Sequence, residues 1–318
     1  MNSKHSQQEK RKMINCLQIS WKTVMGGLTA AVFFLGLSLP GEASLIINDS
    51  FAAADYSGTG FNETGKNPNT GTGDGTAWHL VNYHNESTTT VYNVGDGALN
   101  LSSTRGTLLG PVNHFDARTL ANVGDSLTLT VNASASATSS TNNAFTLVLA
   151  NSNGDRFAAN HASNLNVPNG GTWDAYAVVF PSGTNNGGRI LENEATTASL
   201  FRDSDRGAAG RLDTPNVAGA GLDGTAKDFV LKLEREAGGL RITGMFGNTA
   251  FGNALWENPE TWTFDTVALS FAGNVMRLSA SEEFEAHIHS VQLEYIPEPS
   301  TLVLLGVAGL VLMKRRRV

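Results

Sequence analysis

Apolar and polar residues alternate with a period of two along several short stretches of the chain. In SLTLTVNASA, Leu127, Leu129 and Val131 would lie on one face of an extended chain, with Thr128 and Thr130 on the other. This alternation is typical of a β-strand that buries one face. The pattern therefore predicts a half-buried strand at this position.

The segment KDFVLKLEREAGGLRITGMFG predicts a hairpin. Apolar residues alternate over 229–233, small residues at 237–239 supply a turn, and the chain returns over 240–246. Further strands are predicted in NAFTLVLANSNGD, AYAVVFPSG, DTVALSFAG and AHIHSVQLEYI. Between residues 44 and 296 no helical periodicity is sustained, so these strands are not joined by helical crossovers.

Composition supports a β-rich domain. The chain holds 34 glycines and only 16% charged residues, which suits short strands joined by many turns. Many strands without an internal repeat predict an all-β fold, an antiparallel two-sheet sandwich over 44–296. A pair of immunoglobulin-like domains is the alternative, and the sequence shows no Pro-rich linker that would separate them.

The first 43 residues have the order of a secretory signal peptide. A basic region precedes an apolar run over 25–39, which is predicted to be helical, and GEA then places small residues before a cleavage point after Ala43. An uncut membrane anchor is the alternative. The only cysteine, Cys16, precedes the apolar run, so it is not a lipidation cysteine and the predicted sandwich has no disulfide.

The last 22 residues combine three features in a fixed order. Pro297, Glu298 and Pro299 precede a 14-residue apolar segment over 300–313. A helix of that length spans about 21 Å, which is short of the roughly 30 Å of hydrocarbon in a bilayer. A basic cluster follows and favours the cytoplasmic side of the membrane. It consists of Lys314, Arg315, Arg316 and Arg317.

This tail resembles the PEP-CTERM sorting signal of Gram-negative bacteria. The resemblance implies recognition by an exosortase, a membrane-embedded processing enzyme, and removal of the tail near Pro297–Pro299. The predicted organisation is then a signal peptide over 1–43, a sandwich over 44–296 and a sorting signal over 297–318. Such a protein is anchored transiently in the inner membrane through a short transmembrane helix and ends at the cell surface or outside the cell. An ordinary C-terminal anchor is the alternative.

The sandwich resembles the concanavalin A-like, laminin-G-like jelly rolls. The segments that carry the resemblance are DSF after the signal peptide, LANVGDSLTLTVNAS, NAFTLVLANSNGD and IHSVQLEYIPEP. The resemblance implies that the first and last strands pair, which would bring Ile46 near Leu293.

Charge excludes one class of partner. Residues 44–296 contain 13 Lys and Arg against 26 Asp and Glu, a formal charge of −13. Such a surface repels phosphate backbones, so nucleic acid is not an expected partner. A polysaccharide partner is compatible with this negative charge.

The sequence offers no catalytic motif. Concanavalin A-like glycosidases carry Glu-x-Asp-x-x-Glu on one strand, and this chain has only the cluster Glu282, Glu283 and Glu285, which we interpret as a solvated edge. His287 and His289 could bind zinc with a third ligand, but no third ligand is evident, so we interpret them as outer-face polar residues. We therefore expect no catalytic residues.

Oxygen-bearing side chains alternate at Asn151, Asn153 and Asp155 around a glycine, a weak candidate for calcium. A plain Asn-Gly turn explains the same residues. Asp203 and Asp205 are similar and are interpreted as a surface loop. We therefore expect no cofactor, with Ca²⁺ as the one candidate.

Tryptophans provide the candidate ligand-binding site. Trp256 and Trp262 flank a Pro-containing turn, and an exposed indole can stack on a sugar ring. Packing in the core is the alternative for each ring. Two other aromatic pairs are alternative candidates for this site: Trp78 with Tyr83, and Trp173 with Tyr176.

Together these features predict a secreted, exosortase-sorted and non-catalytic protein that binds glycan or builds exopolysaccharide or biofilm. A divergent extracellular glycoside hydrolase or polysaccharide lyase is the first alternative. A purely structural surface protein is the second.

Overall fold

Two β-sheets make up the folded part of the chain. The computed structural model describes residues 42–52, 78–82, 90–103, 108–135, 144–156, 161–162, 173–181, 189–193, 211–213, 224–257, 262–272 and 284–298. Ala43–Ile296 form one compact unit, and the second unit, Met1–Glu42 with Pro297–Val318, lies almost wholly outside the described residues. The predicted helices of the signal peptide and the tail therefore also lie outside them.

The first sheet, sheet A, has the order β14-β13-β12-β6-β16-β4-β3, and β1 also pairs with β16. Every neighbouring pair in this sheet is antiparallel. Its strands are β1 (Ser44–Asp49), β3 (Thr90–Gly95), β4 (Ala98–Ser103), β6 (Ser126–Ala135), β12 (Lys227–Glu236), β13 (Gly239–Phe246), β14 (Thr249–Trp256) and β16 (Phe284–Ile296).

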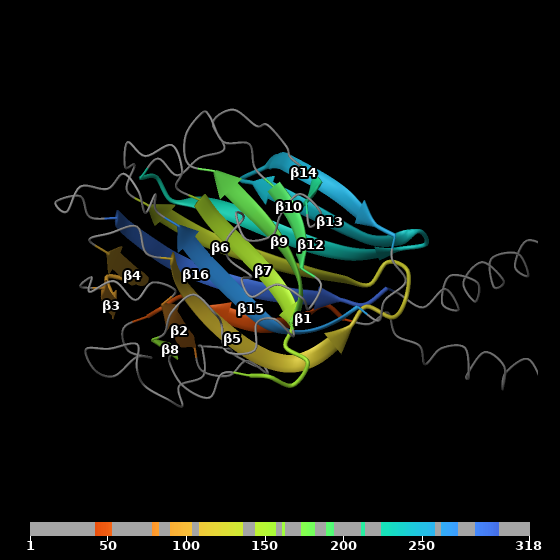
Figure 1. Ribbon diagram of the computed structural model, residues 1–318, viewed down its shortest axis with the longest axis horizontal. Coiled ribbons are helices and arrows are strands. Elements are labelled where there is room, and N and C mark those ends of the chain that lie inside the picture. Colours follow the sequence, from red (N-terminus) through yellow and green to blue (C-terminus); the bar gives the residue numbers. More distant parts are fainter. Residues whose placement is uncertain are drawn as a thin grey trace, which may run out of the picture. The chain divides into compact units, whose positions relative to one another are not determined.

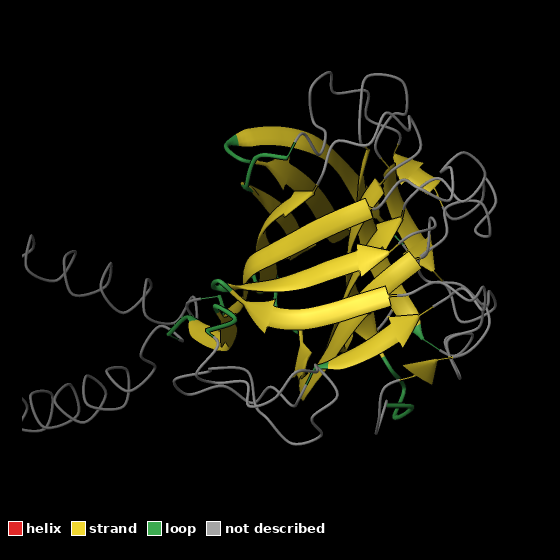
Figure 2. Cartoon of the chain, turned by 90° about the vertical axis from the view of Figure 1, so that its left-hand side faces the viewer, coloured by secondary structure: helices red, strands yellow, loops and turns green. Residues whose placement is uncertain are grey.

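The second sheet, sheet B, has the order β11-β10-β9-β7-β15-β5-β2-β8. Its pairs are antiparallel except for β2 with the two-residue β8, which is parallel. Its strands are β2 (His79–Asn82), β5 (Leu108–Thr119), β7 (Ala144–Asn151), β8 (His161–Ala162), β9 (Asp174–Pro181), β10 (Arg189–Asn193), β11 (Arg211–Asp213) and β15 (Thr263–Ala272). Figures 1 and 2 show the strands of the two sheets as two curved layers. The predicted all-β, two-sheet sandwich is confirmed.

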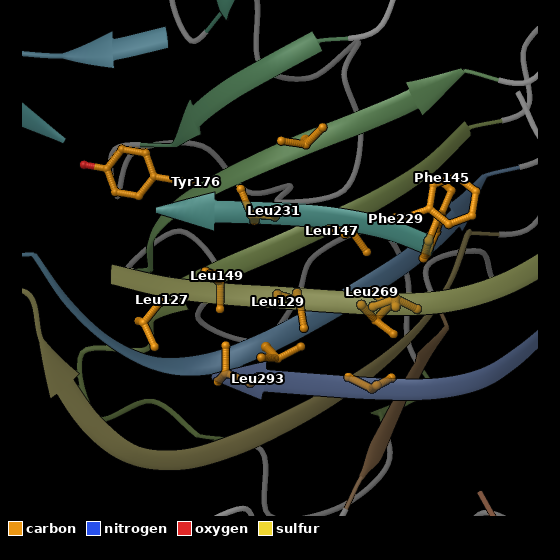
Figure 3. Packing of buried hydrophobic residues seen from close by; sticks show 14 of the residues in the cluster. Leu127, Leu129, Phe145, Leu147, Leu149, Tyr176, Phe229, Leu231, Leu269 and Leu293 are labelled. Atoms are coloured by element: carbon orange, nitrogen blue, oxygen red, sulfur yellow. The ribbon is translucent and has the colours of Figure 1, made fainter. Parts of the chain in front are cut away.

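The core lies between the layers and follows from the period-two pattern. In sheet A, Leu129 stands opposite Leu231 on one side and Leu293 on the other, and all three side chains are buried. Phe145 of sheet B stacks on Phe271 at 4.3 Å between ring centroids. It also meets Phe229 of sheet A edge-on at 4.9 Å, which ties the layers together (Figure 3).

Sheet B is buried on its second face as well. Along β7, Leu147 and Leu149 belong to the main core, whereas Val148 and Ala150 belong to a separate cluster with Ala177 and Ala268. A strand buried on both faces shows a continuous apolar run instead of alternation. This explains why segments such as LVLA and YAVVF carry no polar positions.

The first and last strands pair, as the jelly-roll resemblance implies. Ser44 stands opposite Tyr295, and Asp49 stands opposite Val291. A β-bulge after Leu45 shifts the register, so that Ile47 instead of Ile46 lies opposite Leu293. Both chain boundaries of the sandwich therefore lie at the same end of sheet A.

Two adjacent glycines in the β12–β13 turn generate a matched test of the fold. Gly239 has φ +152°, and a Cβ there would lie 2.1 Å from the backbone oxygen of Trp256. A Cβ on Gly238 would make only an ordinary contact at 3.6 Å with the Leu255 side chain. We expect Gly239→Ala to lower the free energy of unfolding by about 2 kcal/mol or more. Gly238→Ala should change it by less than about 0.5 kcal/mol in the same urea denaturation. Equal effects of the two substitutions would contradict this register.

Candidate functional site

The two tryptophans of the predicted ligand site lie at one end of the sandwich and differ in burial. Trp256 ends β14, stands opposite Leu240, and packs partly buried against the core. Trp262 directly precedes β15 and is only 4% exposed. The residues between them, 258–261, lie outside the described part of the chain.

The environment of Trp262 is that of a core residue. The guanidinium of Arg235 lies 3.9 Å from the ring centroid, a cation–π contact that occupies one face of the indole. The Leu120 amide donates to the Trp262 carbonyl at 2.9 Å. The indole Nε1 and the Arg235 Nε are both buried without a hydrogen-bond acceptor. Trp256 therefore offers the more accessible ring, and glycan contact by this pair stays a prediction.

The alternative tryptophans are buried and hydrogen-bonded. Trp78 is 4% exposed and donates from Nε1 to Asp49 at 2.9 Å. Trp173 is fully buried and donates from Nε1 to the Asp155 carbonyl at 3.0 Å. Tyr176 belongs to the main core, and Tyr83 lies outside the described residues. These rings are structural contacts.

A buried carboxylate in sheet B gathers several donors that the sequence did not single out. Asp265 accepts hydrogen bonds from the Ser152 amide at 2.8 Å, from the Ser152 hydroxyl at 2.6 Å and from the Thr266 hydroxyl at 2.8 Å. Arg156 also donates to it, from Nε and Nη2, both at 3.2 Å. Arg156 Nη2 reaches the Phe115 carbonyl at 2.7 Å as well. This network fastens the turn after β7 to strands β15 and β5.

That turn contains the weak calcium candidates. The Asn151 side-chain oxygen accepts a hydrogen bond from the Asn153 amide at 3.0 Å, and Asn153 Nδ2 donates to Asp174 at 3.2 Å. Asn153 and Gly154 both have positive φ, of 51° and 87°. The contacts are those of an Asx-type turn. Within the described segments, no group of three or more His, Cys, Asp or Glu side chains is placed to hold a metal ion.

Two histidines lie beside the Asp265 network. His114 Nδ1 and the Thr266 hydroxyl are 2.8 Å apart, and the His79 and His114 rings are 6.2 Å apart. Burial lowers the pKa of His114 to about 4, while Asp265 raises it and Arg156 and His79 lower it further. Burial also lowers the pKa of His79. His114 is therefore neutral at pH 7.

The outer face of sheet A carries a series of polar side-chain pairs, here named the polar face. Gln292 donates to Asn48 at 3.2 Å across β16 and β1, and Asn132 donates to Asp228 at 2.7 Å across β6 and β12. His287 and Asn100 are 2.6 Å apart across β16 and β4. The polar face consists of Asn48, Asn100, Asn132, Asp228, His287 and Gln292.

The predicted histidine pair belongs to this surface. The rings of His287 and His289 lie 6.5 Å apart, and His289 also contacts Ser134 at 3.2 Å. Burial and then the nearby His287 lower the pKa of His289. Glu285 is exposed at the start of β16. Glu282, Glu283, Asp203 and Asp205 lie outside the described residues.

The C-terminal motif begins where the sandwich ends. Ile296 is the last residue of β16, and Pro297 and Glu298 directly follow it. Pro299 and the cluster Lys314, Arg315, Arg316 and Arg317 lie outside the described residues. Among the residues that are described, no helix has the length and apolar character needed to span a membrane.

Comparison with known proteins identifies the tail. The family model for the PEP-CTERM protein-sorting motif matches residues 296–317. A search of curated proteins found no match to this chain. The predicted sorting signal is thus confirmed at the end of β16.

Solved structures with a similar chain trace have low sequence identity to this protein. An endo-1,3-β-glucanase from Streptomyces sioyaensis is 11% identical, with 81% of this chain and 98% of that chain covered and a TM-score of 0.48. The carbohydrate recognition domain of Emp47p is 11% identical, with coverages of 68% and 87% and a TM-score of 0.44. The exoplasmic/lumenal domain of VIP36, in a Ca²⁺/Man3GlcNAc-bound form, is 11% identical, with coverages of 68% and 82% and a TM-score of 0.43.

The buried His114 predicts a pH dependence of stability. Its pKa is about 4 in the folded protein, against an ordinary value of 6.5, so the unfolded chain takes up a proton first as the pH falls. The folded state should therefore lose about 3 kcal/mol of stability between pH 6.5 and pH 4. His114→Asn, which keeps a partner for the Thr266 hydroxyl, should remove most of that decline in urea titrations at stepped pH. An unchanged decline in the variant would contradict the assignment.

Proposed function

We propose that the protein is exported, held transiently in the inner membrane by its C-terminal segment, and cut near Pro297–Pro299 by an exosortase-type enzyme. It then remains at the cell surface or in the extracellular matrix. The observation that carries this proposal is the PEP-CTERM motif over 296–317, which follows the last strand without a linker. Because prolines disfavour helix and strand continuation, we expect Pro297 and Pro299 to favour an extended processing motif that the enzyme can reach.

We further propose that the sandwich is a glycan-binding component of extracellular polysaccharide and that the polar face of sheet A is its contact surface. Amide, imidazole and carboxylate groups are suited to sugar hydroxyls, because amides and imidazoles both donate and accept hydrogen bonds and carboxylates accept them. On the polar face they are carried by paired strands and fixed by one another, as in the Asn132–Asp228 and Asn48–Gln292 contacts. Such fixed groups lose little side-chain entropy when a ligand binds.

The proposal assigns no catalytic role. Asp265, one of the buried carboxylates, has both oxygens engaged by Ser152, Thr266 and Arg156. A carboxylate whose oxygens are all engaged is poorly placed to exchange a proton with a substrate. We therefore favour binding over a divergent glycoside hydrolase or polysaccharide lyase.

Processing is tested by the ends of the mature protein. Mass spectrometry of surface material from the native host should find a first residue of Ser44 and a last residue close to the Pro297–Pro299 motif. Glu298→Ala should leave the uncut protein in the membrane fraction, because the motif that the enzyme recognises is changed. Surface material that still ends at Val318 would overturn the sorting proposal.

Glycan binding is tested on the mature, processed protein with the polysaccharide of its own host. Asn132→Ala combined with Gln292→Ala should weaken binding about tenfold, since each hydrogen bond contributes about 0.5–1.5 kcal/mol. The matched control is Thr119→Ala combined with Thr263→Ala, an exposed hydrogen-bonded pair on sheet B, which should bind normally. Equal loss in the two double variants, or loss in neither, would contradict the polar face as the contact surface.

Trp256→Ala tests the stacking prediction separately. Removing one aromatic contact should weaken binding several-fold if the Trp256 ring stacks on a sugar, because such contacts contribute on the order of 1 kcal/mol. The control is Trp262→Phe, which keeps a buried ring under Arg235 and removes the unpaired indole N–H. Unchanged binding by Trp256→Ala would exclude this ring from the glycan site.

We propose that no resident metal is needed. VIP36 is described with bound Ca²⁺, but in this chain the Asn151 side-chain oxygen already accepts a hydrogen bond from the Asn153 amide, and the Asn153 side chain donates to Asp174. Calcium at about 10 mM should therefore leave Tm unchanged, whereas a bound ion with a millimolar dissociation constant would raise it by several degrees. Differential scanning calorimetry with and without calcium distinguishes the two results.

A further inference from the structure

Large apolar side chains are exposed at three positions among the described residues. Val123 is 48% exposed, Leu45 is 39% exposed and Ile296 is 37% exposed. They come from three separate places in the sequence: the start of β1, the turn between β5 and β6, and the end of β16. Exposed apolar residues that are scattered over a surface need no explanation, so their relative position decides whether they matter.

Strand pairing brings the three residues to the same end of sheet A. Leu45 stands opposite Glu294, which makes it the diagonal neighbour of Ile296 on the same face. Ile296 stands opposite Ser126, the first residue of β6. Val123 lies in the tight turn just before it, where the Asp125 amide bonds to the Asn122 carbonyl at 3.1 Å. In Figure 1 this turn and the β12–β13 turn lie at the right-hand end. We use the name apolar rim for the three exposed residues at this end: Leu45, Val123 and Ile296.

The length of the chain limits how far the apolar rim can be from the membrane. The apolar segment of the tail starts at position 300, four residues after Ile296. Four fully extended residues span at most about 14 Å. When the tail is inserted, Ile296 therefore lies within about 14 Å of the hydrocarbon boundary, a distance that reaches into the interfacial region of the bilayer.

Charge argues for an apolar contact with lipid over an electrostatic one. Glu294 stands opposite Leu45, two residues before Ile296, and the exposed Glu298 follows the last strand. Carboxylates at these positions would not be drawn to anionic headgroups. Trp256, at the same end of sheet A, adds a partly buried indole of the kind that favours membrane interfaces.

We infer that the apolar rim contacts the bilayer interface while the tail is inserted. This end of the sandwich then faces the membrane. The inference rests on the proposed insertion of the tail. It adds that the domain is oriented by its own surface and does not swing freely on the three residues Pro297–Pro299. Cleavage of the tail then separates the sandwich from the inserted segment and also releases the apolar rim from the membrane.

The experiment uses lipid-borne quenchers and the full chain, with its signal peptide removed by export, in phosphatidylcholine vesicles. Cys16 is the only native cysteine and belongs to the signal peptide, so an introduced cysteine carries the only label. A fluorophore is attached at Val123→Cys, in the apolar rim, or at Asn248→Cys, in the exposed turn between β13 and β14 at the opposite end. A third label at Ala308→Cys reports insertion of the tail.

We expect headgroup-region quenchers to reduce the fluorescence of the 123 label at least twofold more than that of the 248 label, and acyl-chain quenchers to reduce the 308 label. Adding Leu45→Ser and Ile296→Ser should lower quenching at 123 and leave quenching at 308 unchanged. If the 308 label is quenched while the 123 label behaves like the 248 label, the apolar rim does not contact lipid and this inference fails alone. If the 308 label is not quenched either, the proposed tail insertion fails together with it.

Discussion

The pairing of β1 with β16 is the constraint on which the rest of the architecture depends. β16 is the longest of the described strands, with 13 residues, and it pairs with β6 along one edge and with β4 and then β1 along the other. This arrangement makes the last strand a central strand of sheet A and closes the first strand onto it. It also places Ser44 opposite Tyr295, so that the residues after the predicted signal peptide and those before the sorting motif are neighbours. The first and last residues of the sandwich therefore lie at the same end of sheet A.

Buried carboxylates fix the segments that strand pairing does not reach. Asp49, at the end of β1, accepts bonds from the Phe51 amide at 2.8 Å and from the Trp78 indole at 2.9 Å. Phe51 has φ +48° and is fully buried, a strained conformation that these contacts hold in place. Asp265 acts in the same way on the turn after β7 through Ser152 and Arg156. Both carboxylates therefore have a structural role, because each one joins segments that are far apart in the sequence.

The fold could be predicted from the sequence because its determinants are local. The alternation in SLTLTVNASA is that of β6, and the predicted hairpin is β12 and β13 with the turn at Ala237–Gly238. The candidate site could not be predicted in the same way. Asp265 lies 109 residues from Arg156 and 113 from Ser152, and no local pattern marks a lone aspartate in TFDTVALSF as the centre of a network. Burial of Trp262 under Arg235 likewise depends on a contact that strand order creates.

The most direct test of this account is a disulfide across the β1–β16 pair. Asn48 and Gln292 stand opposite each other with their side chains 3.2 Å apart, and antiparallel partners have the Cα separation that a disulfide requires. The doubly substituted protein, Asn48→Cys with Gln292→Cys, is purified after export and exposed to a mild oxidant in its folded state. Its peptides are then analysed by mass spectrometry. The account predicts one peptide that contains both cysteines joined by a disulfide, with unchanged β-sheet content by circular dichroism. Two thiols that stay free and reactive in the folded protein would contradict the closure of the sandwich by its first and last strands.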